Sequence, residues 1–355
     1  MISTCLDLAL LCHPVLAFLS IQRPKMHAQQ SRWQYFLLSF LSLLAIRYAS
    51  TSYTQAPQDI ISDICQTKDQ PNPIASLYPM NATGTLNGTI SVIPISLKLA
   101  RELIPSQYGI LEHAYRHLLP SFPKDMYPAI LEAMHDHEVQ AFGYQIPDFS
   151  VRPSPTPQES AQKNKKRKNL THMQRAGISF PFLDLLHDNT TSFKWAPSLL
   201  ITASHTVALT GASDYGTHTF PATFSPPCDA YTPVPAAKLP HTTSFSARSQ
   251  HPHPAAISTV FAPTTHDIFP LPFFANVTNQ PTFADGKTCD QMIRFFNTSV
   301  TTAPNRIESV SGTVKATLFP FSEEMVWDHV LGLRLDTAFV ENNYLPCENF
   351  RGYDG

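Results

Sequence analysis

Four consecutive polar residues, His135, Asp136, His137 and Glu138, are of the types that bind metal ions or transfer protons. If this segment is extended, side chains alternate between two faces, so both imidazoles point to the same side. Such a pair could hold zinc if a third ligand came from elsewhere in the chain. The alternative is that these residues belong to the scaffold of a strand. We favour the scaffold and predict no metal ion.

The familiar catalytic motifs are absent from this sequence. It contains no G-x-S-x-G, HExxH, P-loop or dinucleotide-binding pattern, so the ordinary hydrolase, zincin and nucleotide-binding classes have no motif support. A formal net charge of −2 provides no electrostatic attraction for nucleic acid or for an anionic membrane. We therefore predict a small-molecule ligand or substrate, no cofactor and no nucleic-acid partner.

The cysteines indicate an oxidising compartment. Cys5 and Cys12 fall within the N-terminal leader, which leaves Cys65, Cys228, Cys289 and Cys347. An even number of cysteines without C-x-x-C spacing predicts two disulfides rather than a zinc site. Three connectivities are possible.

The N-terminus resembles a signal peptide. Arg23, Lys25 and Arg32 precede an apolar stretch at residues 33–46, and small polar residues follow at 49–52. A basic flank, a short apolar core and small residues are the three parts of a signal peptide, and this core is shorter than the ~20 residues that a spanning helix needs. We predict cleavage near residue 52 and a secreted protein without a stable membrane span. An uncut signal anchor is the alternative.

Six N-x-S/T sequons support export. With 13 Asn and 62 Ser plus Thr residues in the chain, chance predicts roughly two. Each sequon marks a surface position that could be glycosylated in an exported protein. The six acceptor residues are Asn81, Asn87, Asn169, Asn189, Asn276 and Asn297.

Short apolar runs separated by proline predict a mainly β fold after the leader. Strands are expected at residues 88–95, 127–144 (two strands meeting near Asp136), 194–204, 206–211, 217–224, 257–261, 309–319 and 333–340. Ser96 can cap a short helix at residues 97–104, which Pro105 ends. Polar, proline-rich loops are expected at residues 151–176, which include a basic run at 165–168, and at 236–254, which include His251 and His253. We predict one domain, residues 53–355, that forms a barrel or sandwich.

Three segments, in this order, resemble the acetoacetate decarboxylase family. They are residues 95–111 (ISLKLARELIPSQYGIL), residues 130–136 (ILEAMHD) and residues 193–211 (FKWAPSLLITASHTVALTG) with Tyr215-Gly216 and Phe220-Pro221 after them. The C-terminal residues 339–355 are similar to secreted fungal members of the superfamily. The resemblance implies an antiparallel β-barrel with small helices.

The sequence departs from this family at the residues that act. Family enzymes use a lysine that forms a Schiff base with a β-keto acid, and a neighbouring cation and an apolar pocket lower the pKa of that lysine. Here Ala222 and Thr223 occupy the positions of the lysine pair, Gln145 that of a glutamate and Pro94 that of an arginine. The resemblance therefore implies the barrel without the usual decarboxylase activity.

Three polar residues beside the missing lysine turn are expected to face the barrel interior. Lys194 could replace the absent amine from another strand, His218 could act as a general base near neutral pH, and Tyr215 lies between them in sequence. Gln145 is a fourth pocket candidate. In the alternative interpretation, Lys194 extends to the surface and His218 is a hydrogen-bonded structural residue.

Two functions remain open at this stage. The first is a lyase-like accessory enzyme that acts on a small carbonyl-bearing metabolite such as a keto acid or a polyketide-like acid in fungal specialised metabolism. The second is an exported glycoprotein that keeps the barrel as a non-catalytic ligand-binding cavity. A structural cell-surface protein is disfavoured, because the chain has neither a Ser/Thr stalk nor a long repeat.

Overall fold

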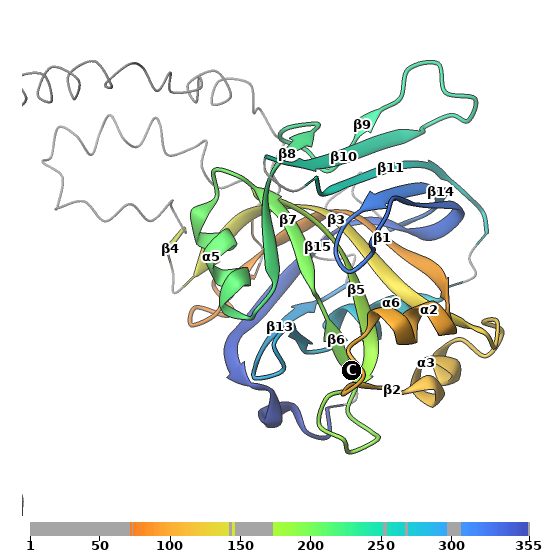
Figure 1. Cartoon of the computed structure of the whole chain (residues 1–355). Helices are drawn as coiled ribbons and strands as arrows, with labels where there is room; N and C mark the ends of the chain where they lie inside the picture. Colours follow the sequence, from red (N-terminus) through yellow and green to blue (C-terminus); the bar gives the residue numbers. More distant parts are fainter. Residues whose placement is uncertain are drawn as a thin grey trace, which may run out of the picture. The chain divides into compact units, whose positions relative to one another are not determined.

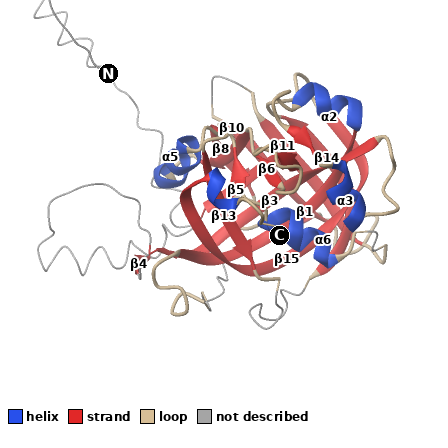
Figure 2. Ribbon diagram, turned by 90° about the horizontal axis from the view of Figure 1, so that it is seen from below, coloured by secondary structure: helices blue, strands red, loops and turns tan. Residues whose placement is uncertain are grey.

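The computed structural model describes residues 72, 74–141, 144–145, 173–250, 254–266, 269–296 and 307–353. These ranges form one compact unit that is mainly β, with short helices on its surface (Figures 1 and 2). The predicted mainly β fold with a few short helices is confirmed. The predicted leader, Cys65, Asn169, Asn297, His251 and His253 lie outside the described residues.

The described chain contains strands of very different lengths. The strands are β1 (Ala82–Ser96), β2 (Gly109–Ile110), β3 (Met126–Ala141), β4 (Tyr144–Gln145), β5 (Met173–Asp184), β6 (Phe193–Trp195), β7 (Ser198–Thr202), β8 (His218–Ser225), β9 (Thr232–Pro233), β10 (Thr243–Ser249), β11 (Ala256–Pro263), β12 (Thr282–Phe283), β13 (Thr288–Arg294), β14 (Glu308–Thr317) and β15 (Met325–Pro346). The helices are α2 (Leu97–Leu103), α3 (Glu112–Leu118), α5 (Thr206–Asp214), α6 (Leu271–Asn279) and the 3₁₀-helix η2 (Cys347–Phe350).

The sheet closes on itself. Successive pairings connect β15 to β1, β3, β5, β6, β12 and β13, and β13 pairs with β15 again. A second path, through β7, β8, β10, β11 and β14, also joins β5 to β15. Most pairs are antiparallel, as predicted, but β6–β12 and β7–β8 are parallel, so the sheet is mixed. Helices α2, α3 and α6 lie at one end of the sheet, and α5 lies apart from them (Figures 1 and 2).

Strand β1 is almost completely buried because it pairs on both sides, with β15 and with β3. Ile90 and Ile93 are fully buried although they point to opposite faces, as expected for a strand covered on both faces. Gly88 allows a close approach here, because a Cβ atom at this position would lie 2.3 Å from the carbonyl oxygen of Ala133. A side chain at residue 88 would therefore force β1 and β3 apart.

The capped helix after β1 forms as predicted. The Ser96 hydroxyl accepts a hydrogen bond from the backbone N–H of Leu99 at 3.1 Å, and α2 ends at Leu103, just before Pro105. The side chain satisfies one of the free N–H groups at the helix start. This helix is a local feature of the sequence.

Two expected strands were assigned wrongly. Residues 127–144 form one long strand, β3, followed by the short strand β4, because Asp136 pairs in register on both sides, with Leu86 and Met173. Residues 206–211 form helix α5 rather than a strand. The Nδ1 atom of His205 accepts a hydrogen bond from the N–H of Ala208 at 3.1 Å, so a side-chain cap starts a helix that the apolar pattern did not indicate.

Three further boundaries differ from the expectation. The strand expected at 194–204 is two strands, β6 and β7, because the chain breaks at Ala196 and Pro197 and each part has its own parallel partner. The loop expected at 236–254 contains β10, which pairs with both β8 and β11. The loop expected at 151–176 ends earlier, because its last four residues belong to β5.

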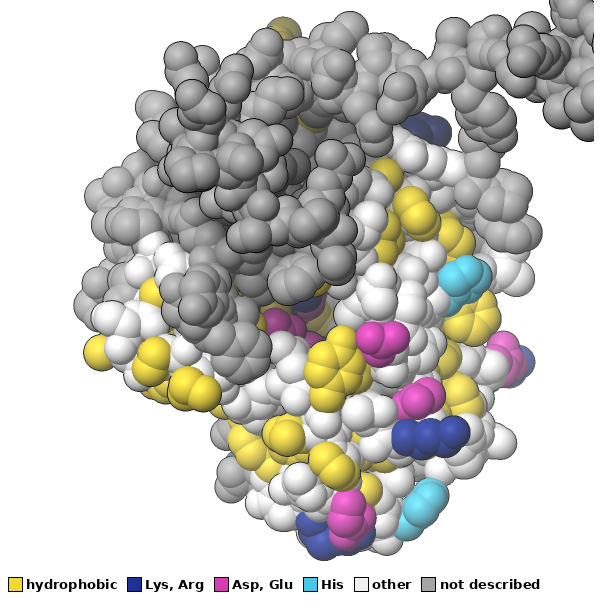
Figure 3. All heavy atoms as spheres, turned by 90° about the vertical axis from the view of Figure 1, so that its left-hand side faces the viewer, with side chains coloured by type: hydrophobic (Ala, Val, Ile, Leu, Met, Phe, Trp, Pro, Cys, Tyr) yellow, Lys and Arg dark blue, Asp and Glu magenta, His cyan; other side chains and the backbone are white. Residues whose placement is uncertain are grey.

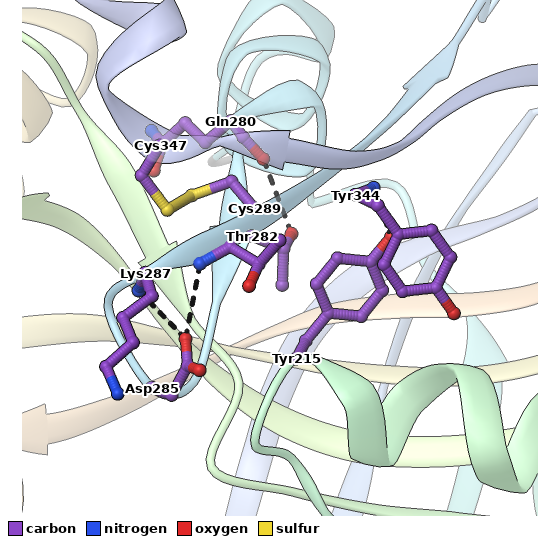
Figure 4. The surroundings of a disulfide bond; sticks show 9 residues. Tyr215, Gln280, Thr282, Asp285, Lys287, Cys289, Tyr344 and Cys347 are labelled. Carbon is purple, nitrogen blue, oxygen red and sulfur yellow. Dashed lines mark hydrogen bonds between the residues drawn. A yellow bond between two sulfur atoms is a disulfide. The ribbon is translucent and has the colours of Figure 1, made fainter.

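A disulfide joins Cys289 of β13 to Cys347 of η2, with the two Cα atoms 5.0 Å apart (Figure 4). Both residues are buried. Cys228 is disulfide-bonded as well. The bridge therefore fixes the start of β13 against the C-terminal end of β15.

We expect Cys289→Ser to lower the free energy of unfolding by ~2–5 kcal/mol, because loss of a native bridge relaxes the constraint on the unfolded chain. Urea denaturation of the secreted protein measures this change. The double variant Cys289→Ser with Cys347→Ser is the control, because it leaves no unpaired thiol at this position. An unchanged free energy of unfolding in both variants would contradict a structural role for the bridge.

The sequons differ in their accessibility. Asn189 is exposed, in a turn after β5, whereas Asn81, Asn87 and Asn276 are half-buried. Asn87 lies in the middle of β1, and the side-chain oxygen of Asn276 accepts a hydrogen bond from Gln280 at 3.1 Å. Among the sequons in the described ranges, Asn189 is thus the most open position for a glycan.

Candidate functional site

A cavity of about 670 Å³ lies within the ring formed by β15, β1, β3, β5, β6, β12 and β13. Every strand of this ring contributes at least one lining residue, and α5 contributes several more. No residue of α5 is buried. On the face that carries α5, acidic and basic side chains lie in a recess among apolar ones (Figure 3). The volume suits a small organic molecule.

Lys194 is the buried amine of this cavity. It lies in β6 between Phe193 and Trp195, with a side chain that is only 5% exposed. Its Nζ donates a hydrogen bond to the carbonyl oxygen of Thr278 at 3.0 Å and lies 4.0 Å from Oε1 of Glu132. Burial lowers the pKa of Lys194 to about 8; Glu132 opposes this shift, and Arg294 and Arg175 add to it. An amine with this pKa is partly unprotonated at neutral pH.

A buried ion pair lies next to the Lys194 amine. Nη1 of Arg294, in β13, lies 2.8 Å from Oε1 of Glu132, in β3. Burial alone would raise the pKa of Glu132, but Arg294, Lys194 and Arg175 outweigh it and lower the pKa to about 2. Glu132 is therefore a carboxylate at all ordinary pH values. Nε of Arg294 is buried and has no hydrogen-bond partner among the described residues.

A second ion pair lines the same cavity. Nε of Arg175, in β5, lies 3.0 Å from Oδ2 of Asp136, and its Nη2 contacts the sulfur of Met292 at 3.0 Å. Burial raises the pKa of Asp136, although Arg175 opposes the shift. Asp136 belongs to the polar run at residues 135–138, which was considered as a possible zinc site. It contacts a guanidinium instead.

A pair of carboxyl groups also belongs to the polar lining of the cavity. Asp290 of β13 and Glu341 of β15 both line the cavity and are joined by a hydrogen bond between their side chains. Burial, followed by the charge and the hydrogen bond of Glu341, raises the pKa of Asp290 well above its ordinary value. A hydrogen bond between two carboxyl groups requires a proton on one of them.

Two stacked tyrosines form part of the cavity wall. The rings of Tyr215 and Tyr344 are 4.8 Å apart and nearly parallel (Figure 4). The Tyr215 hydroxyl accepts a hydrogen bond from the backbone N–H of Tyr344 at 2.8 Å and donates one to Asn343 at 3.3 Å. Tyr215 is buried, whereas Tyr344 is 51% exposed. Tyr344 therefore extends this wall toward the surface.

The structure brings together two of the four pocket candidates from the sequence. Lys194 and Tyr215 both line the cavity, so Lys194 does not extend to the surface. His218 is not among the lining residues; it is exposed on β8 and stacks on Phe220 with 4.4 Å between the ring centroids. Gln145 lies in β4, and its side chain is outside the described part of the structure. Ala222 is buried in β8 and is not among the lining residues.

Sequence reasoning missed the charged partners of Lys194. Pro94, the position considered for the family arginine, is not among the lining residues, whereas Arg294 and Glu132 line the cavity. One signal was present: Glu132 is a lone charge within the apolar run of residues 129–134. Such a charge is rarely buried without a partner. The identity of that partner depends on the pairing of distant strands.

The described ranges contain neither a cluster of metal-binding side chains nor a helix that could span a membrane. No group of three His, Cys, Asp or Glu side chains there is arranged to hold a metal ion. His135 and Asp136 are both buried in β3. None of the described helices has the length and hydropathy that a membrane span requires.

Comparison with known proteins finds similarity in structure alone. No protein-family model and no curated protein matches the chain. The structure of the enduracididine biosynthesis enzyme MppR complexed with pyruvate is similar over 75% of this chain and 89% of that chain, with 8% identity and a TM-score of 0.41. MppR with HEPES buffer bound is similar over 75% and 85%, with 9% identity and the same TM-score.

An acetoacetate decarboxylase-like enzyme from Sphingomonas wittichii RW1 is also similar, over 75% of this chain and 92% of that chain, with 8% identity and a TM-score of 0.39. Similarity at this level does not identify the residues that act. The chemistry of this chain follows from its own cavity.

Proposed function

We propose that the chain is an enzyme that forms a Schiff base between Lys194 and a small carbonyl compound, with a keto acid as the favoured substrate class. The observation that carries this proposal is a buried amine with a pKa of about 8 on the wall of a 670 Å³ cavity. At pH 7 about one such amine in ten is unprotonated, against about one in three thousand for a lysine at its ordinary pKa.

The reaction uses the free amine of Lys194. Its nitrogen bonds to the carbonyl carbon, and the carbonyl oxygen leaves as water after it takes one proton from the amine nitrogen and one from solvent, which produces an iminium ion. The iminium withdraws electrons from the adjacent bond, so a proton or a carboxylate on the α-carbon can leave. Water then hydrolyses the iminium and restores the amine. The exclusion of bulk water from a buried site favours formation of the iminium.

The lining also offers a position for the acid group of the substrate. Nε of Arg294 is a buried donor without a partner among the described residues, and such a group is costly unless a ligand accepts its hydrogen bond. A carboxylate oxygen is a strong acceptor for a guanidinium N–H. This supports a keto acid over a neutral ketone of the same size.

The test is borohydride trapping with three probes: pyruvate, acetoacetate and acetone. We expect both keto acids to label Lys194, with acetone labelling it less, as measured by peptide mass spectrometry. The non-catalytic ligand-binding protein is the rival. Binding of the keto acids in calorimetry without any label on Lys194 would favour this rival and contradict the enzyme.

We also propose that the enzyme is exported as a glycoprotein, in a secreted fungal branch of the acetoacetate decarboxylase-like superfamily, and acts in specialised metabolism. The signal-like leader, the excess of sequons and the disulfides support this. A metabolite comparison between a deletion strain and its parent should show accumulation of one carbonyl precursor in the deletion strain. Unchanged metabolites would contradict the metabolic role.

Secreted protein is expected to begin between residues 49 and 53 and to lose mass on treatment with a glycosidase. Asn189 is expected to be occupied, because it is exposed in a turn. N-terminal sequencing and glycopeptide mapping measure both properties. A mature N-terminus at Met1 or Met26 would contradict cleavage, and Asn189→Gln with an unchanged glycan mass would contradict occupancy at that residue.

A further inference from the structure

The carboxyl pair lies close to the amine because of the register of three strands. Lys194 of β6 pairs with Thr282 of β12, and Thr282 pairs with Asp290 of β13. Residues in register on neighbouring strands point to the same face, and all three line the cavity. Two strand spacings place the Cα atoms of Lys194 and Asp290 about 10 Å apart.

Glu341 reaches the same point from the other side of β13. It pairs with Met292, two residues after Asp290, and the β13–β15 pairing is irregular between Cys289 and Gln291. Asp290, Met292 and Arg294 all line the cavity. Phe339, Glu341 and Asn343 likewise line the cavity from alternate positions of β15. The Cys289–Cys347 bridge fixes the strand directly before Asp290. The carboxyl pair is thus held in place by both strands.

We propose that Asp290 and Glu341 share one proton and transfer it to and from the α-carbon of a substrate bound to Lys194 as an iminium ion. This inference rests on the proposed Schiff-base function and assigns its acid–base group. The proposed substrate class is a keto acid with at least one hydrogen on a carbon next to the keto group, which is the carbon called the α-carbon in this proposal.

The proton transfer balances as follows. The C–H bond at the α-carbon breaks, and its electron pair forms the C=C bond of an enamine while the electrons of the C=N bond move onto nitrogen. The proton goes to the ionised carboxyl group of the pair, so that Asp290 and Glu341 together then carry two protons. The reverse step returns a proton to carbon and restores the shared state. If carbon dioxide leaves instead, the enamine takes the shared proton, and the pair then takes up a proton from solvent to restore the shared state.

Glu132 and Asp136, two other acidic groups of the cavity, are less suited to this role. Glu132 is held as a carboxylate by Arg294, so it neither keeps nor donates a proton at neutral pH. Asp136 is paired with Arg175 at 3.0 Å. Asp290 has an oxygen, Oδ1, that is buried without a hydrogen-bond partner among the described residues. An effective proton-transfer group needs a pKa near the working pH, and a shared proton raises the pKa of one carboxyl group.

The experiment measures exchange of the pyruvate methyl hydrogens with deuterium by NMR, with borohydride trapping on Lys194 measured in parallel on the same secreted protein. The variants are Asp290→Asn and Glu341→Gln, which keep the shape of each side chain. Asp328→Asn is the matched control, because Asp328 also lies in β15 but bonds to Thr313 outside the cavity.

We expect each acid variant to lower the exchange rate by about 10²- to 10⁴-fold while trapping stays within about threefold of wild type. The control variant should match wild type in both assays. Either acid variant suffices if the other fails to fold. Wild-type exchange in a folded acid variant, or a wild-type protein that traps pyruvate without exchanging its hydrogens, would overturn the proposal.

Two other outcomes separate the failure of the proton-transfer role from the failure of the Schiff-base function. Loss of trapping in folded Asp290→Asn and Glu341→Gln would overturn the proton-transfer role, because the pair would then serve the amine itself. No trapping by wild type with any keto acid would overturn the Schiff-base function, and this inference with it.

Discussion

Lys194→Met is expected to abolish borohydride trapping of keto acids and to lower turnover on the order of 10⁴-fold or more, the scale of losing a covalent nucleophile. Methionine matches the length of the lysine stem but has no amine. Glu132 keeps its contact with Arg294 at 2.8 Å, so the variant should fold. Peptide mass spectrometry and product formation measure the two effects.

Lys315→Met is the matched control, because Lys315 is exposed on β14. It should trap keto acids at the wild-type rate. Trapping that survives in Lys194→Met, or that disappears in Lys315→Met, would assign the nucleophile to another lysine and contradict the proposed function.

The pH dependence of trapping and of stability, compared between wild type and Lys194→Met, tests the burial of the Lys194 amine. Trapping by wild type should increase with pH through about 8, the pKa of Lys194 in the folded protein. The unfolded chain, with a lysine pKa near 10.5, binds more protons between these two values, so the free energy of unfolding should rise with pH across that window. The rise amounts to about 3 kcal/mol at most. Lys194→Met should lack this rise in denaturant unfolding, whereas equal pH dependence in both proteins would contradict a lowered pKa.

Arg294→Met is expected to lower the free energy of unfolding by ~3–5 kcal/mol, because it leaves the Glu132 carboxylate buried without its close partner. It also removes a cation that lowers the pKa of Lys194. The pH midpoint of trapping should therefore move above 8, and trapping at pH 7 should become slower. Denaturant unfolding and the pH profile of trapping measure the two consequences.

Glu132→Gln is the informative counterpart. It removes the anion that raises the pKa of Lys194, so the midpoint of trapping should move below 8 even though this variant is also less stable. Arg248→Met is a control for loss of a positive charge, because Arg248 is exposed on β10. Shifts of the midpoint in the same direction for Arg294→Met and Glu132→Gln would contradict electrostatic control of the amine.

The sequence by itself determined the features that depend on neighbouring residues. Ser96 and Pro105 bound helix α2 because a side-chain cap and a proline act within one turn. The apolar runs predicted the mainly β class. The prediction that Lys194 and Tyr215 face the cavity followed from their positions in and just after the segment at residues 193–211.

Only the tertiary structure decided which charges surround Lys194. Its register with Thr282 and Asp290, and the approach of Glu132 and Arg294, depend on pairings between strands far apart in the chain. Strand register is a non-local property, and a shift of one residue would turn each side chain to the other face. The lowered pKa of Lys194 likewise results from burial inside a closed ring of strands, which no local pattern of residues encodes.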